Sequence, residues 1–183
     1  ALSACGKNPR TEIQQASKSV CAGEVYAGGS AYTGDGPHPL VLSLEDGGRH
    51  NWNNDLPKEW FPAEAEQTQL VACVGEPAEV RVELCEYNGP DIIRYRYDTR
   101  VWIVEAKTGR VVAEQTFQGS EPRACGNSED YDLTEIHGIE VVYSDVEGWL
   151  QQYVMSEPRS AQPTSTRLAP AEPEVSTQEV KDI

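Results

Sequence analysis

The 183-residue sequence lacks the long apolar runs and the short catalytic motifs that identify many functional classes directly. It has no stretch of 18 or more consecutive apolar residues, so no segment is predicted to cross a bilayer as a helix. It also has no G-x-S-x-G, H-E-x-x-H, Walker or dinucleotide-binding motif. We therefore expect a protein that is not an enzyme and that holds no cofactor.

Basic residues are scarce as well, since 15 Lys and Arg stand against 30 Asp and Glu, a net charge of −15. The acidic excess lies in residues 20–155, whereas residues 1–19 hold three basic residues and one acidic residue. An acidic body repels phosphate groups, so nucleic acid is not an expected partner. The mildly basic N-terminal segment instead suits a position close to anionic lipid.

None of the five cysteines forms a C-x-x-C pair, which argues against thioredoxin-like chemistry, a zinc ribbon and a c-type haem. The stretch Leu2-Ser3-Ala4-Cys5 resembles the lipobox of bacterial lipoproteins, in which small residues precede the cysteine that receives diacylglycerol. The alternative is a chance tetrapeptide, which the residues before Cys5 favour because a processed lipoprotein begins at that cysteine. Assigning a lipid to Cys5 leaves an even number of cysteines, Cys21, Cys73, Cys85 and Cys125, to form two disulfides.

The composition divides the chain into three regions. Residues 1–20 form an N-terminal tether, in which a short helix over 6–19 is conceivable but a spacer is the main interpretation. Residues 21–155 form a disulfide-bridged β domain. Residues 156–183 form an extended tail of Pro, Ser, Thr, Ala and Glu, which buries too little apolar surface to fold alone. We expect this tail to lie on a neighbouring protein subunit.

Alternating patterns rich in β-branched and aromatic residues predict the strands. After a strand in "PLVLSLEDGG", four more follow in "TQLVACV", "EVRVELCEY", "DIIRYRYDTRVWIVEA" and "RVVAEQTF". Ser144 and Glu147 have the spacing of a capping box that opens a helix through Trp149, Leu150 and Val154. The predicted fold is mainly β: an antiparallel meander or sandwich-like sheet of five to seven strands with one short C-terminal helix.

The alternation also predicts strand registers. Around Gly89-Pro90, Leu84 should face Tyr95 and Val82 should face Tyr97, a register that pairs Glu83 with Arg96 and Arg81 with Asp98. In the next hairpin, Gly109 should occupy the left-handed position of a three-residue loop with a bulge. That loop places Ile103 opposite Ala113 on the core face and Val104 opposite Val112.

The meander suggests a disulfide pairing, because it brings Cys85 near the loop that carries Cys125 and leaves Cys73 for Cys21. Four cysteines allow three connectivities, and we favour Cys21–Cys73 with Cys85–Cys125.

Several groups of residues have a functional and a structural interpretation. The row Arg94, Arg96 and Arg100 suits an anion site or, in better agreement with the charges, a solvated face paired with Glu83 and Glu114. Cys73-x11-Cys85 and Cys125-x11-His137 echo each other but lack the knuckles of zinc sites. Residues 127–132 are acidic but lack calcium-loop spacing, so a solvated loop is expected, with an irregular calcium site as the alternative.

Aromatic and histidine residues offer two further candidate sites. His137 with Glu135 would suit an acid/base pair, although thirty acidic residues make such adjacency expected by chance. Trp52 and Trp60 would stack on a sugar ring if exposed, or cap the core together with Phe61.

The stretches "QLVACV", "CEYNG", "RYRYDTRVWIVEAKTGRVVAEQTFQGSEPRAC" and "WLQQYV" carry a resemblance over roughly residues 67–154. This part of the chain resembles an uncharacterised β-rich module of exported bacterial proteins and lipoproteins, most specifically in the Thr-Gly turn and in the spacing of Gly119, Pro122 and Cys125. The resemblance implies an extracytoplasmic, cysteine-bridged domain, and it implies no catalytic residue.

These observations predict a non-catalytic accessory or structural subunit of a membrane-associated complex. An electron-transfer complex is one kind of complex to which the subunit could belong. A lipid on Cys5 would hold it at the extracytoplasmic face of a bacterial membrane, and its tail would contact other subunits. The alternative is a lipid-anchored binding module for a carbohydrate or peptide, which needs a cleft lined by Trp52, Trp60 or the arginine row. A divergent hydrolase is third, and it needs His137 beside a carboxylate inside a pocket.

Overall fold

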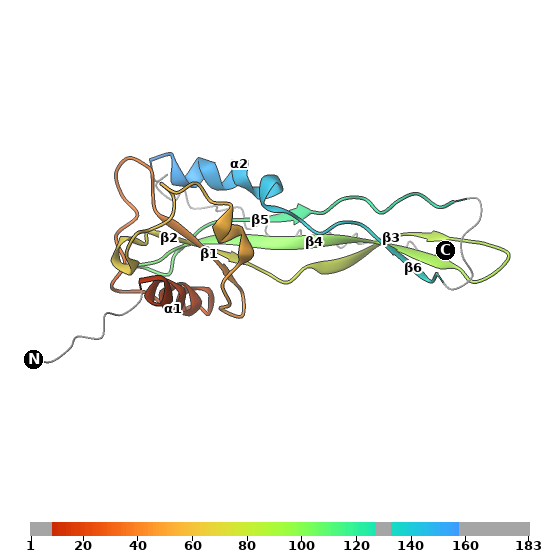
Figure 1. Ribbon diagram of the computed structural model, residues 1–183, viewed down its shortest axis with the longest axis horizontal. Coiled ribbons are helices and arrows are strands. Elements are labelled where there is room, and N and C mark those ends of the chain that lie inside the picture. Colours follow the sequence, from red (N-terminus) through yellow and green to blue (C-terminus); the bar gives the residue numbers. More distant parts are fainter. Residues whose placement is uncertain (1–8, 127–132, 158–183) are drawn as a thin grey trace, which may run out of the picture.

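The structure, a computed structural model, describes residues 9–126 and 133–157. A broad body holds both helices, and a narrow arm extends from one end of the sheet (Figure 1). The long strand β4 (Ile92–Glu105) belongs to both parts, because its C-terminal half lies in the body and its N-terminal half forms the centre of the arm.

Six strands of the described residues form one mixed sheet, which confirms the prediction of a mainly-β fold with five to seven strands and a C-terminal helix. Beside β4 they are β1 (Leu40–Leu44), β2 (Leu70–Val74), β3 (Ala78–Cys85), β5 (Val111–Gln118) and β6 (Glu135–His137). The order in the body is β1-β2-β4-β5, whereas β3 and β6 flank β4 in the arm. Two pairs, β1 with β2 and β4 with β6, are parallel rather than antiparallel, because the chain between them crosses over instead of turning back.

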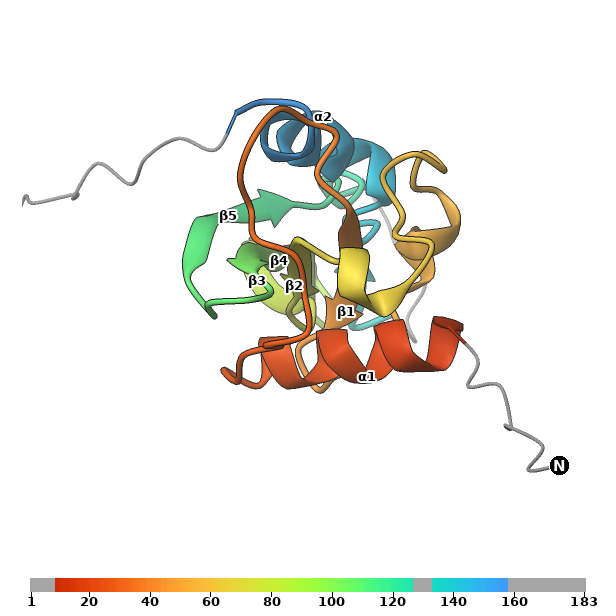
Figure 2. The ribbon, with the colours of Figure 1, turned by 90° about the vertical axis from the view of Figure 1, so that its left-hand side faces the viewer.

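The body has three layers, with helix α1 (Pro9–Cys21) on one face of the sheet and helix α2 (Tyr143–Val154) on the other (Figure 2). Because both faces are covered, alternate residues of each body strand enter different clusters. Leu40, Leu70 and Ile103 pack with Leu150 of α2, while Cys73 and Trp102 pack with Val20 of α1. This double burial explains why β1 and β2 are almost continuously apolar.

The interpretation of residues 6–19 as mainly a spacer is wrong for residues 9–19, because α1 packs on the sheet. Its buried residues Ile13, Ala16, Ser17 and Val20 follow the i, i+3, i+4, i+7 spacing of one helical face. Short side chains at two of these positions made the pattern weak in the sequence.

A segment of irregular structure over residues 22–39 connects α1 to β1 and reaches from one helix layer to the other (Figure 2). The backbone N–H of Tyr26 donates to Ala106 O, and the Tyr32 hydroxyl donates to Tyr153 O. The backbone N–H of His38 donates to Val154 O, and the His38 ring is fully buried. The bonds from Tyr32 and His38 attach the last turn of α2 to the body, and the bond from Tyr26 attaches the segment to the end of β4.

Both favoured disulfides are confirmed, each with a Cα–Cα separation of 5.6 Å. Cys21–Cys73 joins the end of α1 to β2 in the body. Cys85–Cys125 joins the end of β3 to the segment after β5 in the arm. Two disulfides are typical of an oxidising compartment outside the cytoplasm.

The predicted register of the β3–β4 hairpin is wrong. Leu84 faces Ile93 rather than Tyr95, and a bulge at Val82 shifts the pairing so that Arg81 faces Tyr95. The connection is therefore a six-residue loop rather than a tight turn. In this register Ile92 packs against Cys85, so the small core of the arm outweighs the predicted charge pairs.

The β4–β5 hairpin follows the prediction more closely. Ile103 faces Ala113 on the core face, and Gly109 has a left-handed φ of 71°. The bulge falls at Val112, so Val104 faces Val111 instead of Val112.

Helix α2 packs as predicted through Leu150 and Val154, and the rings of Trp149 and Tyr153 lie against the same core. The predicted capping box is wrong, because the helix begins one residue before Ser144. The carboxylate that accepts a bond at the helix start belongs to Asp145, which accepts from the backbone N–H of Val142 at 3.0 Å.

Candidate binding sites

The two faces of the arm differ in what covers them. On one face, Arg94 donates to Pro122 O and forms an ion pair with Glu83, while Arg96 forms ion pairs with Asp98 and Glu121. The Cys85–Cys125 disulfide holds the segment after β5 against this face. This face is therefore closed by its own chain.

The opposite face of the arm carries partly exposed aromatic rings, and we call it the aromatic face. It comprises Ile93, Tyr95 and Tyr97 of β4 and His137 of β6, flanked by Glu79 and Arg81 of β3 and Glu135 of β6. Alternation along β4 puts these residues on the same side as Val101 and Ile103, which α2 covers in the body. The side chains of Tyr95 and Tyr97 are half-buried.

The rings of the aromatic face are ordered by stacking and hydrogen bonds. The His137 ring lies 5.3 Å from the Tyr95 ring and 5.6 Å from the Tyr97 ring, each at an interplanar angle of 19°. The Tyr97 hydroxyl lies 3.0 Å from His137 Nδ1 and 3.4 Å from Glu79 Oε1. His137 Nε2 lies 3.2 Å from Glu135 Oε2 and Nδ1 lies 3.6 Å from Glu79 Oε1, so the imidazole lies between two carboxylates.

Carboxylates outnumber the cation Arg81 on the aromatic face and give it a negative character. Burial raises the pKa of Tyr97, and the charges of Glu79, Glu140 and Glu135 raise it further. The Tyr97 phenol therefore stays protonated, and its ring stands among three carboxylates. A negative potential beside aromatic π faces favours a cation.

The arginine row is paired rather than open, as its structural interpretation predicted. Arg94 pairs with Glu83, and Arg100 binds Glu114 with its Nε 2.8 Å from Oε1. The row is less solvated than expected, because Arg94 is only 8% exposed beneath the segment that carries Pro122. The Arg100 guanidinium also lies 4.7 Å from the centre of the Trp102 ring.

His137 and Glu135 are within hydrogen-bond reach, as the hydrolase hypothesis requires, but they lie on the exposed arm and line no part of the pocket found in the body. General acid/base catalysis needs a substrate position beside the pair. The pair is therefore better explained as part of the aromatic face.

The two tryptophans have different roles. Trp60 is 4% exposed in the main core, and Trp52 and Phe61 pack against that core. The prediction that these three residues cap the core is confirmed. Because Trp60 is buried, it cannot stack on a sugar.

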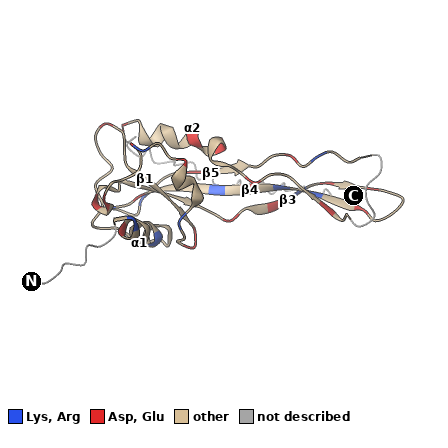
Figure 3. Cartoon of the chain, in the orientation of Figure 1, with Lys and Arg blue, Asp and Glu red and all other residues tan. Residues whose placement is uncertain are grey.

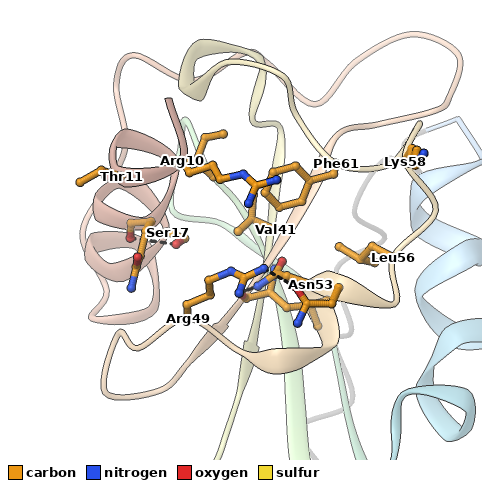
Figure 4. A pocket seen from close by; sticks show the side chains of 13 residues that line it. Arg10, Thr11, Ser17, Val41, Arg49, Asn53, Leu56, Lys58 and Phe61 are labelled. Atoms are coloured by element: carbon orange, nitrogen blue, oxygen red, sulfur yellow. Dashed lines mark hydrogen bonds between the residues drawn. The ribbon is translucent and has the colours of Figure 1, made fainter. Parts of the chain in front are cut away.

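A pocket of about 490 Å³ lies in the body between α1, β1 and the loop that contains the short helix η1 (Asn51–Asn54) (Figure 4). Its floor includes Val41 and Leu42 of β1. Asn53 closes the edge of β1 there, since its side chain accepts from Leu42 N–H at 2.9 Å and donates to Leu42 O at 2.6 Å. The edge strand is thus sealed by a side chain instead of another strand.

Three cations line this pocket: Arg10 from α1, Arg49 before η1 and Lys58 after it. Sequence reasoning missed them, because they lie far apart in the chain and α1 was interpreted as a spacer. The signal that was available is the location of these basic residues in the first third of an otherwise acidic chain. Figure 3 shows basic residues on α1 and along β4.

The remaining candidate sites are the metal sites and the segments that lie outside the described residues. Within residues 9–126 and 133–157, no group of three or more His, Cys, Asp or Glu has the arrangement of a metal site. The cysteines of the conceivable zinc set, Cys73, Cys85 and Cys125, belong to the two disulfides. Cys5, the acidic loop 127–132 and most of the tail, from residue 158 on, lie outside the described residues.

Comparison with protein-family models, with curated proteins and with solved structures finds no match. The part of the chain that the structure describes holds no helix with the length and apolar character needed to span a membrane. Function must therefore be argued from this chain's own two surfaces, the aromatic face and the pocket.

Proposed function

We propose that this chain is a non-catalytic accessory subunit that docks, through the aromatic face of its arm, on a basic segment of a partner protein. The observation that carries the proposal is the contrast between the two faces of the arm. One is closed by the segment after β5, and the other presents Tyr95, Tyr97 and His137 beside Glu79 and Glu135.

The chemistry of this face fits a Lys or Arg side chain of the partner. A cation over an aromatic ring contributes about 0.5–1 kcal/mol when exposed and about 2 kcal/mol when desolvated. The flanking carboxylates add charge complementarity, which steers encounter and sets the orientation of docking. The disulfide that closes the arm keeps the platform in shape before the partner arrives.

The place of the subunit is part of the proposal. The disulfides fit an oxidising compartment. A lipid on Cys5 at the extracytoplasmic face of a bacterial membrane would hold the body close to the bilayer, and the tail of residues 156–183 would lie on a neighbouring subunit. The resemblance of residues 67–154 to modules of exported bacterial proteins supports the same location.

The test is co-purification of the native chain under non-denaturing conditions. We expect a fixed partner to co-migrate at constant stoichiometry, and cross-links to join its Lys- or Arg-rich segment to the arm. The double variant Glu79→Lys/Glu135→Lys should lower the recovery of that partner about tenfold, since repulsion replaces attraction.

The matched control is Glu24→Lys/Glu66→Lys, which makes the same change in net charge at two exposed residues of the body. This control should retain the partner. The proposal fails if the arm variant retains the partner as well as the native chain does, or if the chain migrates alone.

A further inference from the structure

The pocket of the body combines an apolar floor with a cationic rim. Ile13, Val41 and Leu42 contribute to the floor and are at most 4% exposed, and Leu56 and Phe61 extend it. Arg10, Arg49 and Lys58 are exposed residues that line the same pocket. Figure 4 shows Arg10 and Arg49 on opposite sides of Val41, with Lys58 beyond Leu56 and Phe61.

The charge of this rim runs against the composition of the chain. Acidic residues outnumber basic ones by 30 to 15, yet the charged residues that line the pocket are all basic. The residues Arg10 and Thr11 also belong to the first turn of α1, where the helix dipole adds positive potential, and the acidic residue of that turn, Glu12, is not among the pocket's lining residues. The pocket is therefore a local region of positive potential in an acidic protein.

One rim cation is held in place while keeping donors for a ligand. Arg49 Nη2 donates to Asn54 Oδ1 at 2.6 Å, which orients the guanidinium beside the pocket. A guanidinium has five N–H donors in a planar fork, and that fork matches the oxygens of a carboxylate or phosphate. Asn53 is only 8% exposed and fixes the adjacent backbone.

We infer that this pocket binds a small amphiphilic anion, in which a carboxylate or phosphate head lies among the rim cations Arg10, Arg49 and Lys58 and an apolar body covers Val41, Leu56 and Phe61. The volume of about 490 Å³ is within the range of small-molecule sites. A neutral sugar would not use the cations, and a bare inorganic anion would make no contact with Leu56 and Phe61.

The experiment is calorimetric titration of the oxidised full chain with decanoate and with decyl phosphate. Decanol keeps the apolar body without the charge, acetate keeps the charge without the body, and decyltrimethylammonium reverses the charge. We expect decanoate or decyl phosphate to bind at least tenfold tighter than any of these three. The two heads also distinguish a carboxylate ligand from a phosphate ligand.

Two variants test the rim directly. Arg49→Gln and Lys58→Gln should each weaken binding of the better probe about tenfold, because each removes one charge-assisted contact. Lys107→Gln makes the same charge change in the exposed β4–β5 turn and should leave affinity unchanged. Arg49→Gln also removes the hydrogen bond to Asn54 of η1 and could disturb that loop. Lys58→Gln changes the charge of the rim without removing that bond, so weaker binding by both variants points to the lost charge.

The inference is overturned if decanol binds as tightly as the charged probes, if Lys107→Gln weakens binding as much as Lys58→Gln, or if neither charged probe binds. These outcomes leave the docking proposal untouched, because that proposal concerns the arm and uses none of the pocket residues.

Discussion

His50 holds the start of η1 through its ring, since Nδ1 accepts a hydrogen bond from the backbone N–H of Trp52 at 3.2 Å. That role needs a neutral ring with an unprotonated Nδ1. Burial lowers the pKa of His50 from its ordinary value of 6.5, which agrees with the neutral form. Protonation of this half-buried side chain would remove the hydrogen bond to Trp52 N–H, so the loop beside the pocket depends on pH through His50.

The sign of the resulting pH dependence follows from proton linkage. A histidine with a lower pKa in the folded state binds more protons in the unfolded state, so stability falls as the pH drops through the unfolded value of about 6.5. We expect His50→Asn, which keeps an acceptor but does not titrate, to lose this part of the pH dependence. Urea denaturation of both proteins between pH 5 and pH 8 measures the difference. Parallel stability curves for the two proteins would show that His50 contributes nothing.

At the scale of elements, the two disulfides stabilise different parts of the molecule. Cys21–Cys73 spans 52 residues and attaches α1 to the body, and Cys85–Cys125 spans 40 residues and closes the arm. Loop-closure entropy alone assigns each about 4 kcal/mol. Their local effects should nevertheless differ, because the arm has only a small core around Cys85, Ile92 and Ile136.

We therefore expect Cys85→Ala/Cys125→Ala to raise amide hydrogen exchange mainly in β3 and in the N-terminal half of β4. Protection in β2 and in Val101–Glu105 of β4 should persist, because the three-layer packing there is intact. The double variant Cys21→Ala/Cys73→Ala is the comparison, and it should expose α1 instead. Equal loss of protection in arm and body after the arm variant would show that the two parts unfold as one unit.

The elements themselves were largely predictable, whereas their long-range arrangement was not. Strand patterns and the Thr108-Gly109 turn act within a few residues, so the β4–β5 hairpin was predicted to within one bulge. The β3–β4 register depended on the distant Cys125 and Pro122, which cover the arm only in three dimensions. The arginine pairs with Glu83 and Glu114 were predictable because charged residues on neighbouring strands select each other even when the exact register is wrong.

The candidate sites were harder to predict than the elements, and for a related reason. His137 and Glu135 are two residues apart in the sequence and were identified, but Tyr95, Tyr97 and Glu79 join them only through the parallel β4–β6 pair and the β3–β4 pair. The pocket required α1 to pack on β1, which a weakly amphipathic segment did not indicate. The aromatic face depends on the crossover that brings β6 beside β4, and the pocket depends on α1 packing against β1. No short-range pattern encodes either arrangement.

At the scale of the whole molecule, the two proposed binding surfaces lie on different parts of the described chain. The pocket lies in the body beside α1, and the aromatic face lies on the arm (Figure 1). A tether at Cys5 would leave the chain through the N-terminal end of α1, on the pocket side of the body. The arm would then be available to a partner while the body stays near the membrane.

The intact mass of the native chain, before and after reduction, tests this arrangement. Two disulfides predict a gain of four hydrogens on reduction, and a lipid on Cys5 predicts a diacylglycerol-sized increment on the fragment that carries it. Cys5→Ser is the control, since it should lose the increment and leave the membrane fraction while it keeps both disulfides. An unmodified Cys5 would remove the membrane tether from the proposal, and docking on a partner would then have to hold the subunit in place by itself.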